Sequence, residues 1–238
     1  MKLKIKRFDG DRSYFEEFEV EVRDDETVLE VLDKINRVKR NIAYRSFCRS
    51  SICGTCAIRL NQRSVLACKT KVKDLVQDGE LVIEPLNKLK VIRDLVVDHS
   101  YLEESHRRLK NYFVDEIDEK KENLQLPNEL KIYDKQTDCI GCMACYSECD
   151  ALLNDPNFAG PFSFTKVYRF VNDSRDKMDK QERIEIAKQN NLYSCVNCQK
   201  CYLSCPKGIS SMNDIKLLQT KDENPPFGLG GMDFGGFF

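Results

Sequence analysis

The sequence predicts an α+β protein in which an N-terminal β-grasp domain is followed by an α-helical domain. Three features of the sequence lead to this prediction. Short segments of alternating apolar and polar residues fill much of the first hundred positions, one amphipathic helical segment interrupts them, and helical periodicity dominates from about residue 100 onward. This order of strands, helix and strands is typical of a small mixed sheet covered by one helix.

The first hundred residues contain the predicted sheet and its covering helix. The segments 2–7 and 15–22 alternate with period two, and the charged sequence DGDR between them suits a hairpin turn. Thr27 and Glu30 form a T-x-x-E capping box, a common helix start, and apolar residues follow it at helical spacing through Ile35. Further strands are expected at 57–60, 64–67 and 81–86.

Three helices are expected in the second half of the chain. Each is preceded by a capping residue with an acidic residue three positions later: Ser100 with Glu103, Asp179 with Glu182, and Ser211 with Asp214. The C-terminal tail is rich in Gly, Pro and Phe without any period, so we expect it to be extended. The predicted divisions of the chain are therefore 1–100, 101–221 and the tail 222–238.

Composition and charge exclude several classes of protein. Of the 238 residues, 41% are hydrophobic, which is typical of a folded globular protein, and 38 basic residues nearly balance 39 acidic ones. No strong field is available to attract nucleic acid, so no nucleic-acid partner is expected. No apolar run is long enough for a transmembrane helix or a secretory signal. Any membrane association should therefore be peripheral and made through a partner, on the cytoplasmic face by default or on the periplasmic face after export alongside a signal-bearing subunit.

Twelve cysteines are the most informative feature of the composition. Disulfide frameworks belong mainly to small secreted domains, and structural zinc sites usually combine two CxxC pairs, or one pair with histidines, around a single metal. The two histidines, His99 and His106, lie far from any cysteine in the sequence. The cysteines divide instead into three groups of four with none left over, which favours iron-sulfur clusters.

The first group has the plant-type spacing of a 2Fe-2S site. Its members read C-x4-C-x2-C with a more distant fourth cysteine, and they are Cys48, Cys53, Cys56 and Cys68. Gly54 lets the backbone approach the cluster and leaves amides free to point at the sulfurs. Thr55 and Ser51 are candidate hydroxyl donors that would raise the reduction potential of the cluster; the alternative is that they only fill a polar loop.

The second and third groups repeat the spacing of two-cluster bacterial ferredoxins, C-x2-C-x2-C-x3-C. In that pattern three cysteines of each run bind one cluster and the fourth binds the other, because the two loops pack face to face. One 4Fe-4S cluster is assigned to Cys139, Cys142, Cys145 and Cys205. The other cluster, 4Fe-4S or 3Fe-4S, is assigned to Cys149, Cys195, Cys198 and Cys201. Such crossed ligation ties the domain together, so the iron-free protein is expected to fold poorly.

Taken together, these motifs resemble the iron-sulfur subunits of succinate dehydrogenases and fumarate reductases. The segment SFCRSSICGTCAIRLNQRSVLAC is similar to the 2Fe-2S loop of that family, with Arg49 in place and Ser51 where a glycine is usual. Segments 85–98, 158–176 and 204–209 resemble the link between the family's domains and the stretches between and after its cluster runs. The resemblance covers nearly the whole chain to about residue 220.

The resemblance implies an electron-transfer subunit with no catalytic residues of its own. It would carry electrons between an FAD-bearing, dicarboxylate-binding subunit and a quinone-reactive membrane partner, as in enzymes of the respiratory chain and the tricarboxylic acid cycle. The 2Fe-2S cluster would lie nearest the flavin, and FAD is expected only on the partner subunit.

Two departures from the family pattern concern the third cluster and its partner. Most relatives lack a cysteine at the position of Cys198 and hold a 3Fe-4S cluster there, whereas a fourth thiolate allows a fourth iron and should lower the reduction potential. Ubiquinone-reactive relatives have a tryptophan and a histidine where this chain has Asn154 and Val196, so no ubiquinone site is assigned. Both changes resemble a branch whose partner carries cysteine-rich (CCG) domains in place of the usual heme-bearing membrane anchor.

Two alternatives compete with this interpretation. The alternative within electron transfer is the iron-sulfur subunit of a thiol-driven fumarate reductase or of a heterodisulfide-reductase-like complex. A stand-alone ferredoxin or a cluster-based redox sensor is the alternative from another class, although a sensor would need a DNA-binding helix and a basic patch, and neither is evident in the sequence.

Overall fold

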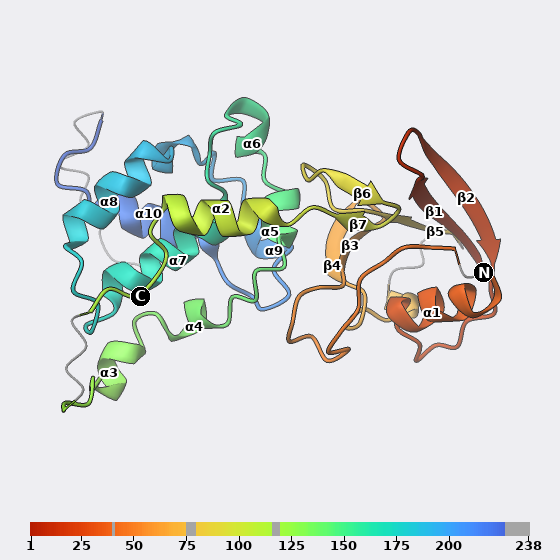
Figure 1. The fold of residues 1–238 in the computed structure, drawn as a ribbon, viewed down its shortest axis with the longest axis horizontal. Coiled ribbons are helices and arrows are strands. Elements are labelled where there is room, and N and C mark those ends of the chain that lie inside the picture. Colours follow the sequence, from red (N-terminus) through yellow and green to blue (C-terminus); the bar gives the residue numbers. More distant parts are fainter. Residues whose placement is uncertain (40, 75–79, 116–119, 227–238) are drawn as a thin grey trace.

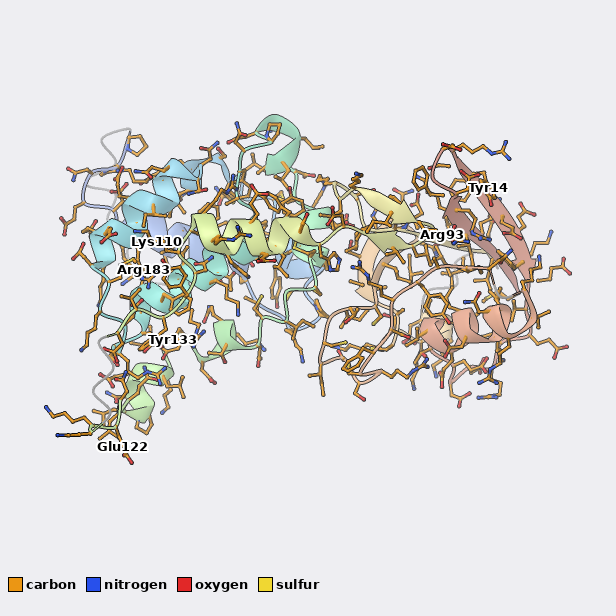
Figure 2. All side chains as sticks on the ribbon, viewed as in Figure 1. Tyr14, Arg93, Lys110, Glu122, Tyr133 and Arg183 are labelled. Atoms are coloured by element: carbon orange, nitrogen blue, oxygen red, sulfur yellow. The ribbon has the colours of Figure 1, made fainter. Side chains whose placement is uncertain are left out.

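A sheet-containing half and a helical half lie end to end in the computed structural model, which describes residues 1–39, 41–74, 80–115 and 120–226 (Figure 1). They are joined through the short ribbon of β6 (Val91–Arg93) and β7 (Val96–Val97). Tyr14 and Arg93 mark the sheet half in Figure 2, and Tyr133 marks the helical half. Among the described residues, no helix has the length and apolar character needed to cross a bilayer.

The sheet half is the β-grasp that the sequence predicts. Its strands are β1 (Lys2–Phe8), β2 (Ser13–Glu19), β3 (Ala57–Leu60), β4 (Arg63–Leu66) and β5 (Glu80–Glu84). They lie in the order β2-β1-β5-β3-β4, with β1 parallel to β5 and the other pairs antiparallel. The second strand ends at Glu19, which pairs with Lys2, and so it is shorter than the predicted strand, although the Val20 N–H still donates to the Met1 carbonyl over 3.1 Å.

One helix, α1 (Val28–Lys39), covers this sheet as expected. Its capping box is formed on both sides: the Glu30 N–H donates to Thr27 Oγ1 over 3.3 Å, and the Thr27 N–H donates to Glu30 Oε2 over 2.8 Å. The apolar stripe of the helix is buried against fully buried strand residues such as Leu3 and Ile83. The sheet half therefore has a hydrophobic core of its own.

The helical half is built around α7 (Pro161–Asn172), nine of whose residues are buried. The remaining helices are α2 (Ser100–Arg108), α3 (Pro127–Leu130), α4 (Asp134–Thr137), α5 (Ala144–Ser147), α6 (Ala151–Asn154), α8 (Lys180–Gln189), α9 (Lys200–Leu203) and α10 (Ser211–Thr220). The 3₁₀ turns are η1 (Val72–Asp74) and η2 (Leu192–Ser194). Because α2, α4, α5, α8 and α10 all pack on α7, this helix sets the arrangement of the half.

The three predicted helices are present, but only one of their predicted caps is. Asp179 accepts a hydrogen bond from the Glu182 N–H over 2.9 Å, as expected for an N-cap. The caps at the other two helices were wrong. Ser100 already lies in the helix, and its N–H donates to Asp98 Oδ1. The Ser211 hydroxyl lies 2.9 Å from the hydroxyl of Thr165 on α7, because burial against that helix supplies a better partner than the helix end. The predicted extended tail lies largely outside the described residues, which end at 226.

Candidate iron-sulfur sites

The first cysteine group lies at one end of the sheet half. The loop between α1 and β3 contains Cys48, Cys53 and Cys56. The fourth cysteine, Cys68, lies two residues after the end of β4. The β3–β4 hairpin brings the fourth cysteine back to the loop, since the Ala67 N–H donates to the Cys56 carbonyl over 3.1 Å. The fold therefore gathers the four cysteines that the spacing groups together.

Backbone amides of this loop point at the sulfurs. The N–H groups of Ser50, Ile52 and Cys53 lie 3.3 to 3.4 Å from Cys48 Sγ. These amides, with that of Ser50 contributing most, lower the pKa of Cys48 to about 6. The Ser51 N–H donates to Cys68 Sγ over 3.3 Å. The loop thus stabilises negative charge on sulfur, which is what a metal-bound thiolate requires.

Two non-glycine residues of the loop adopt the left-handed conformation that turns successive amides inward, Arg49 with φ 57° and Ser51 with φ 59°. This conformation explains why a glycine is usual at position 51. Thr55 Oγ1 donates to Cys53 Sγ over 3.0 Å, in agreement with the predicted hydroxyl donor, whereas Ser51 contributes its backbone N–H. Arg49 also anchors the loop, because its guanidinium pairs with Asp33 on α1 at 2.6 Å.

The second and third groups border two separate cavities in the helical half. One cavity is lined by Cys139, Cys142, Cys145 and Cys205 together with Phe162, Thr165 and Ser211. The other is lined by Cys149, Cys195, Cys198 and Cys201 together with Phe158 and Met212. Each cavity thus brings together three cysteines of one run and the last cysteine of the other, which is the crossed grouping that the sequence predicts.

The two cysteine runs have the same backbone form. Gly141 and Asn197, which precede the second cysteine of each run, have φ 61° and 55°, and Met143 and Gln199, which follow it, have φ 64° and 62°. A four-residue helix then carries the third cysteine in both runs, α5 in one and α9 in the other. Because spacing and backbone repeat together, the two runs present their thiols in the same way.

The donor set of these cavities fits iron-sulfur clusters. All twelve cysteines lie within the described residues and carry free thiols. Burial raises the pKa of Cys142 and of Cys201 to about 12, and it raises that of Cys145 well above the ordinary value. Buried thiolates need a compensating positive charge, and iron supplies it. Within the described ranges, no three His, Cys, Asp or Glu side chains are close enough to hold a single metal ion, and the quartets instead surround open space.

The cavity of the third group lies at the surface. Cys198 is the exposed cysteine of the chain, and Val196 beside it is 46% exposed. Asn154, at the end of α6, is also exposed. A group bound in this cavity would therefore be accessible to a partner from outside.

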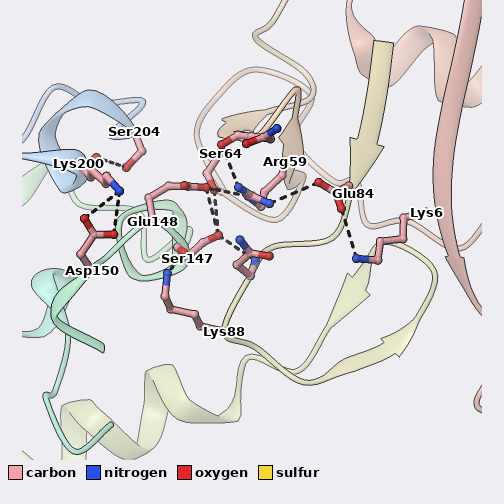
Figure 3. Close-up of polar contacts among 12 residues, drawn as sticks. Lys6, Arg59, Ser64, Glu84, Lys88, Ser147, Glu148, Asp150, Lys200 and Ser204 are labelled. Carbon is pink, nitrogen blue, oxygen red and sulfur yellow. Dashed lines mark hydrogen bonds and ion pairs between the residues drawn. The ribbon is translucent and has the colours of Figure 1, made fainter. Parts of the chain in front are cut away.

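A polar network joins the two halves, and sequence reasoning missed it. Ser147 and Glu148 lie between Cys145 and Cys149 of the second cysteine group, and they contact the sheet half (Figure 3). Glu148 Oε1 accepts from Arg59 Nε over 2.9 Å and from Ser64 Oγ over 2.6 Å. Lys88 Nζ donates to the Ser147 carbonyl over 2.6 Å. These residues have no spacing signal in the sequence, because they are neighbours only after both halves have folded.

Comparisons with known proteins match both halves. Residues 2–104 match the family described as a 2Fe-2S iron-sulfur cluster binding domain, and residues 135–209 match the family described as a 4Fe-4S dicluster domain. The chain therefore carries 2Fe-2S and 4Fe-4S cluster-binding domains in the order that the sequence predicts.

Several curated proteins are similar along most of this chain. The 8-methylmenaquinol:fumarate reductase iron-sulfur subunit of Wolinella succinogenes is 38% identical over 92% of the chain and 72% of its own length. The fumarate reductase iron-sulfur subunit of Escherichia coli O6:H1 is 34% identical over 81% of the chain and 82% of its own length. A subunit of the CoM/CoB fumarate reductase of Methanothermobacter marburgensis is 33% identical over 90% of the chain, which spans only 42% of that longer relative.

A solved structure shares the fold. A chain of the Mycobacterium smegmatis Sdh1 complex in the apo form matches 94% of this chain and 98% of its own length with a TM-score of 0.83, at 23% sequence identity. At this identity the likeness establishes the arrangement of a sheet half followed by a helical half.

Proposed function

Since the chain belongs to the iron-sulfur subunits of fumarate reductases and succinate dehydrogenases, we propose that it carries electrons between an FAD-bearing, dicarboxylate-binding subunit and a quinone-linked membrane partner. Its place in the family makes it an electron-transfer subunit of an oxidoreductase. The observation that carries the proposal is the grouping of all twelve cysteines into three quartets, each at its own site.

The proposed inventory is one 2Fe-2S cluster and two 4Fe-4S clusters. Cys48, Cys53, Cys56 and Cys68 would hold the first, Cys139, Cys142, Cys145 and Cys205 the second, and Cys149, Cys195, Cys198 and Cys201 the third. The two lined cavities support the crossed assignment, and the presence of Cys198 at the second cavity supports a fourth iron there. An additional thiolate at this centre is expected to lower its reduction potential.

The residues of this chain would hold and insulate the clusters and would not act on a dicarboxylate. When bound, each cluster takes up and releases one electron at a time. The amides around Cys48 stabilise thiolate charge, and the apolar side chains of Phe162 and Phe158 line the two cavities of the helical half and limit the access of water to them. Acid–base chemistry on succinate or fumarate is assigned to the flavin subunit.

The partner at the third cluster is proposed to differ from a ubiquinone-reactive membrane anchor. Val196 lines the second cavity and Asn154 ends α6, and ubiquinone-reactive relatives have a histidine and a tryptophan at these two positions. We therefore propose a partner with cysteine-rich (CCG) domains, and a peripheral position of the complex on the membrane. The similarity to a CoM/CoB fumarate reductase favours a second candidate, in which a dithiol pair supplies the electrons for fumarate reduction.

The test is anaerobic purification of the native complex through an affinity tag on this chain. The expected result is a complex that contains an FAD protein and reduces a dye when succinate is added. Dye reduction that depends on a thiol pair and not on succinate would favour the second candidate. Recovery of this chain alone as a monomer, without an FAD protein, would contradict the subunit assignment in favour of a stand-alone ferredoxin.

A further inference from the structure

The two halves lie close together at Gly54. This residue has φ 72°, and a Cβ added there would lie 2.9 Å from Cys142 Cβ, 3.0 Å from the Ile140 carbonyl oxygen and 3.2 Å from Cys142 Cα. Real Cβ atoms essentially never show a contact as short as the first, and the other two would be tighter than nine in ten of the contacts that Cβ atoms make. A side chain at position 54 would therefore force the first cysteine loop away from the second.

The contact joins residues that belong to two different cysteine groups. Gly54 follows Cys53 of the first group directly, and Cys142 is itself a member of the second group. A second contact has the same character: Lys69 Nζ donates to the Pro206 carbonyl over 3.0 Å, which links the neighbour of Cys68 to the neighbour of Cys205. The loops of the first two sites thus meet at Gly54 and Cys142 and again at Lys69 and Pro206.

The polar network holds this contact in place. Ser147 and Ser64 are both buried, and their hydroxyl oxygens lie 3.0 Å apart across the junction of the two halves. Together with the hydrogen bond from Lys88 to Ser147, this contact fixes the second cysteine group, which includes Cys145 and Cys149, against the sheet half (Figure 3). The distance between the loops is therefore set by packing at Gly54 and maintained by hydrogen bonds elsewhere.

We propose that Gly54 is a positioning residue for electron passage between the 2Fe-2S site and the first 4Fe-4S site, because its lack of a side chain allows the two ligand loops to lie in backbone contact. The proposal rests on the proposed function. One electron leaves the 2Fe-2S centre, which is oxidised, and reduces the 4Fe-4S centre; no proton or atom is transferred. Gly54 touches neither substrate nor flavin and acts only through the separation of the loops.

A simpler role for Gly54 is to supply the left-handed backbone conformation alone. Gly208 separates the two roles, because it lies three residues after the proposed ligand Cys205 and has a similar φ of 66°, yet a Cβ there would meet nothing within 4 Å. Gly208→Ala imposes the same backbone strain without pushing any loop away. It is the matched control for Gly54→Ala.

The experiment compares the two variants in the anaerobic complex. Electron paramagnetic resonance of the fully reduced protein measures the magnetic interaction between the 2Fe-2S and 4Fe-4S centres, and rapid mixing measures how fast the second centre is reduced after the first. We expect Gly54→Ala to keep its iron content while the interaction weakens and the transfer rate falls severalfold. Gly208→Ala should leave both quantities unchanged.

Equal interaction and rate in Gly54→Ala and the unmodified protein would overturn the proposal, as would an equal loss in Gly208→Ala. If the unmodified protein itself shows no two interacting centres, the proposed function fails instead, so the two failures are distinguishable. Lys88→Met provides a second route if Gly54→Ala does not retain its clusters, since it removes one hydrogen bond across the junction and leaves the residues of both cysteine loops unchanged. A weaker magnetic interaction is expected, and an unchanged one would contradict the proposal.

Discussion

At the scale of single residues, Asp214 is a carboxyl buried beside the cavity of the second cysteine group. It accepts hydrogen bonds from Gln136 and from Thr165, and Thr165 lines that cavity. Burial raises the pKa of Asp214 to about 6, although the two hydrogen bonds act in the opposite direction. The folded chain therefore holds this proton more tightly than the unfolded chain does.

This pKa makes stability depend on pH. Between about pH 4 and about pH 6 the unfolded chain loses the proton first, so the free energy of unfolding should fall as pH rises, by up to about 3 kcal/mol. Asp214→Asn can accept from Gln136 and cannot ionise, so it should remove this fall. The measurement is urea unfolding of the anaerobic protein across that range. An unchanged pH dependence in Asp214→Asn would show that Asp214 does not titrate there.

On the proposed ligand assignment, Cys198 decides the type of the third cluster. Because it is exposed at the rim of its cavity, removing its thiol should leave the other three cysteines of the quartet in place. Cys198→Ser should lose one iron per chain and show the resonance of an oxidised 3Fe-4S centre, at a higher reduction potential. Leu203→Ala, a change at a neighbouring exposed position, is the control. An unchanged iron content and spectrum in Cys198→Ser would mean that Cys198 is not a ligand.

The cysteines could be grouped from the sequence because ligand spacing is a local property, whereas Asp214 and Glu148 could not be recognised. A buried carboxyl has no sequence signature when its partners lie on other elements, as Gln136 and Thr165 do for Asp214. Gly54 was singled out from the sequence, but its contact with the other half was not anticipated. Its interpretation as a residue that frees amides overlooked the contact with Cys142, which exists only between the two folded halves.

At the scale of secondary structure, the capping box of α1 should contribute measurably to the sheet half. Thr27→Ala removes the side-chain oxygen that accepts from the Glu30 N–H, and it should lower the free energy of unfolding by about 1 kcal/mol. Thr27→Ser keeps that oxygen and should cost much less. The midpoint of urea unfolding of the sheet half checks both. Equal losses in the two variants would assign the effect to the methyl group and not to the cap.

Elements with strong periodicity or a local cap were predicted well, and elements fixed by their partners were not. The strands β1 and β5 and the helix α1 have their signals within their own residues. The ribbon of β6 and β7 was missed, because its strands contain three and two residues and are too short to show alternation. The predicted cap at Ser100 failed because Ser100 is the first residue of its helix. The predicted cap at Ser211 failed because its hydroxyl lies against Thr165 of the neighbouring helix α7.

At the scale of the whole molecule, the two halves depend differently on iron. The sheet half buries residues such as Leu3, Ile5 and Leu81 completely, and none of these contacts requires a cluster. In the helical half, α5 and α9 contain four residues each, and both carry cysteines that border the two cavities. Helices of this length do not form by themselves in water, so we expect the folding of α5 and α9 to depend on the iron bound by their cysteines.

Removal of iron should therefore unfold the chain unevenly. In anaerobic iron-free protein, hydrogen exchange measured by mass spectrometry should show that β1, β5 and α1 keep their protection, because their hydrophobic core persists. Protection at α5, α9 and the cysteine runs should be lost, since the buried thiols then surround a space with no bonds across it. Rebuilding the clusters should restore protection there, which is the control for irreversible damage. Persistent protection of α5 and α9 without iron would show that packing on α7 alone orders the helical half.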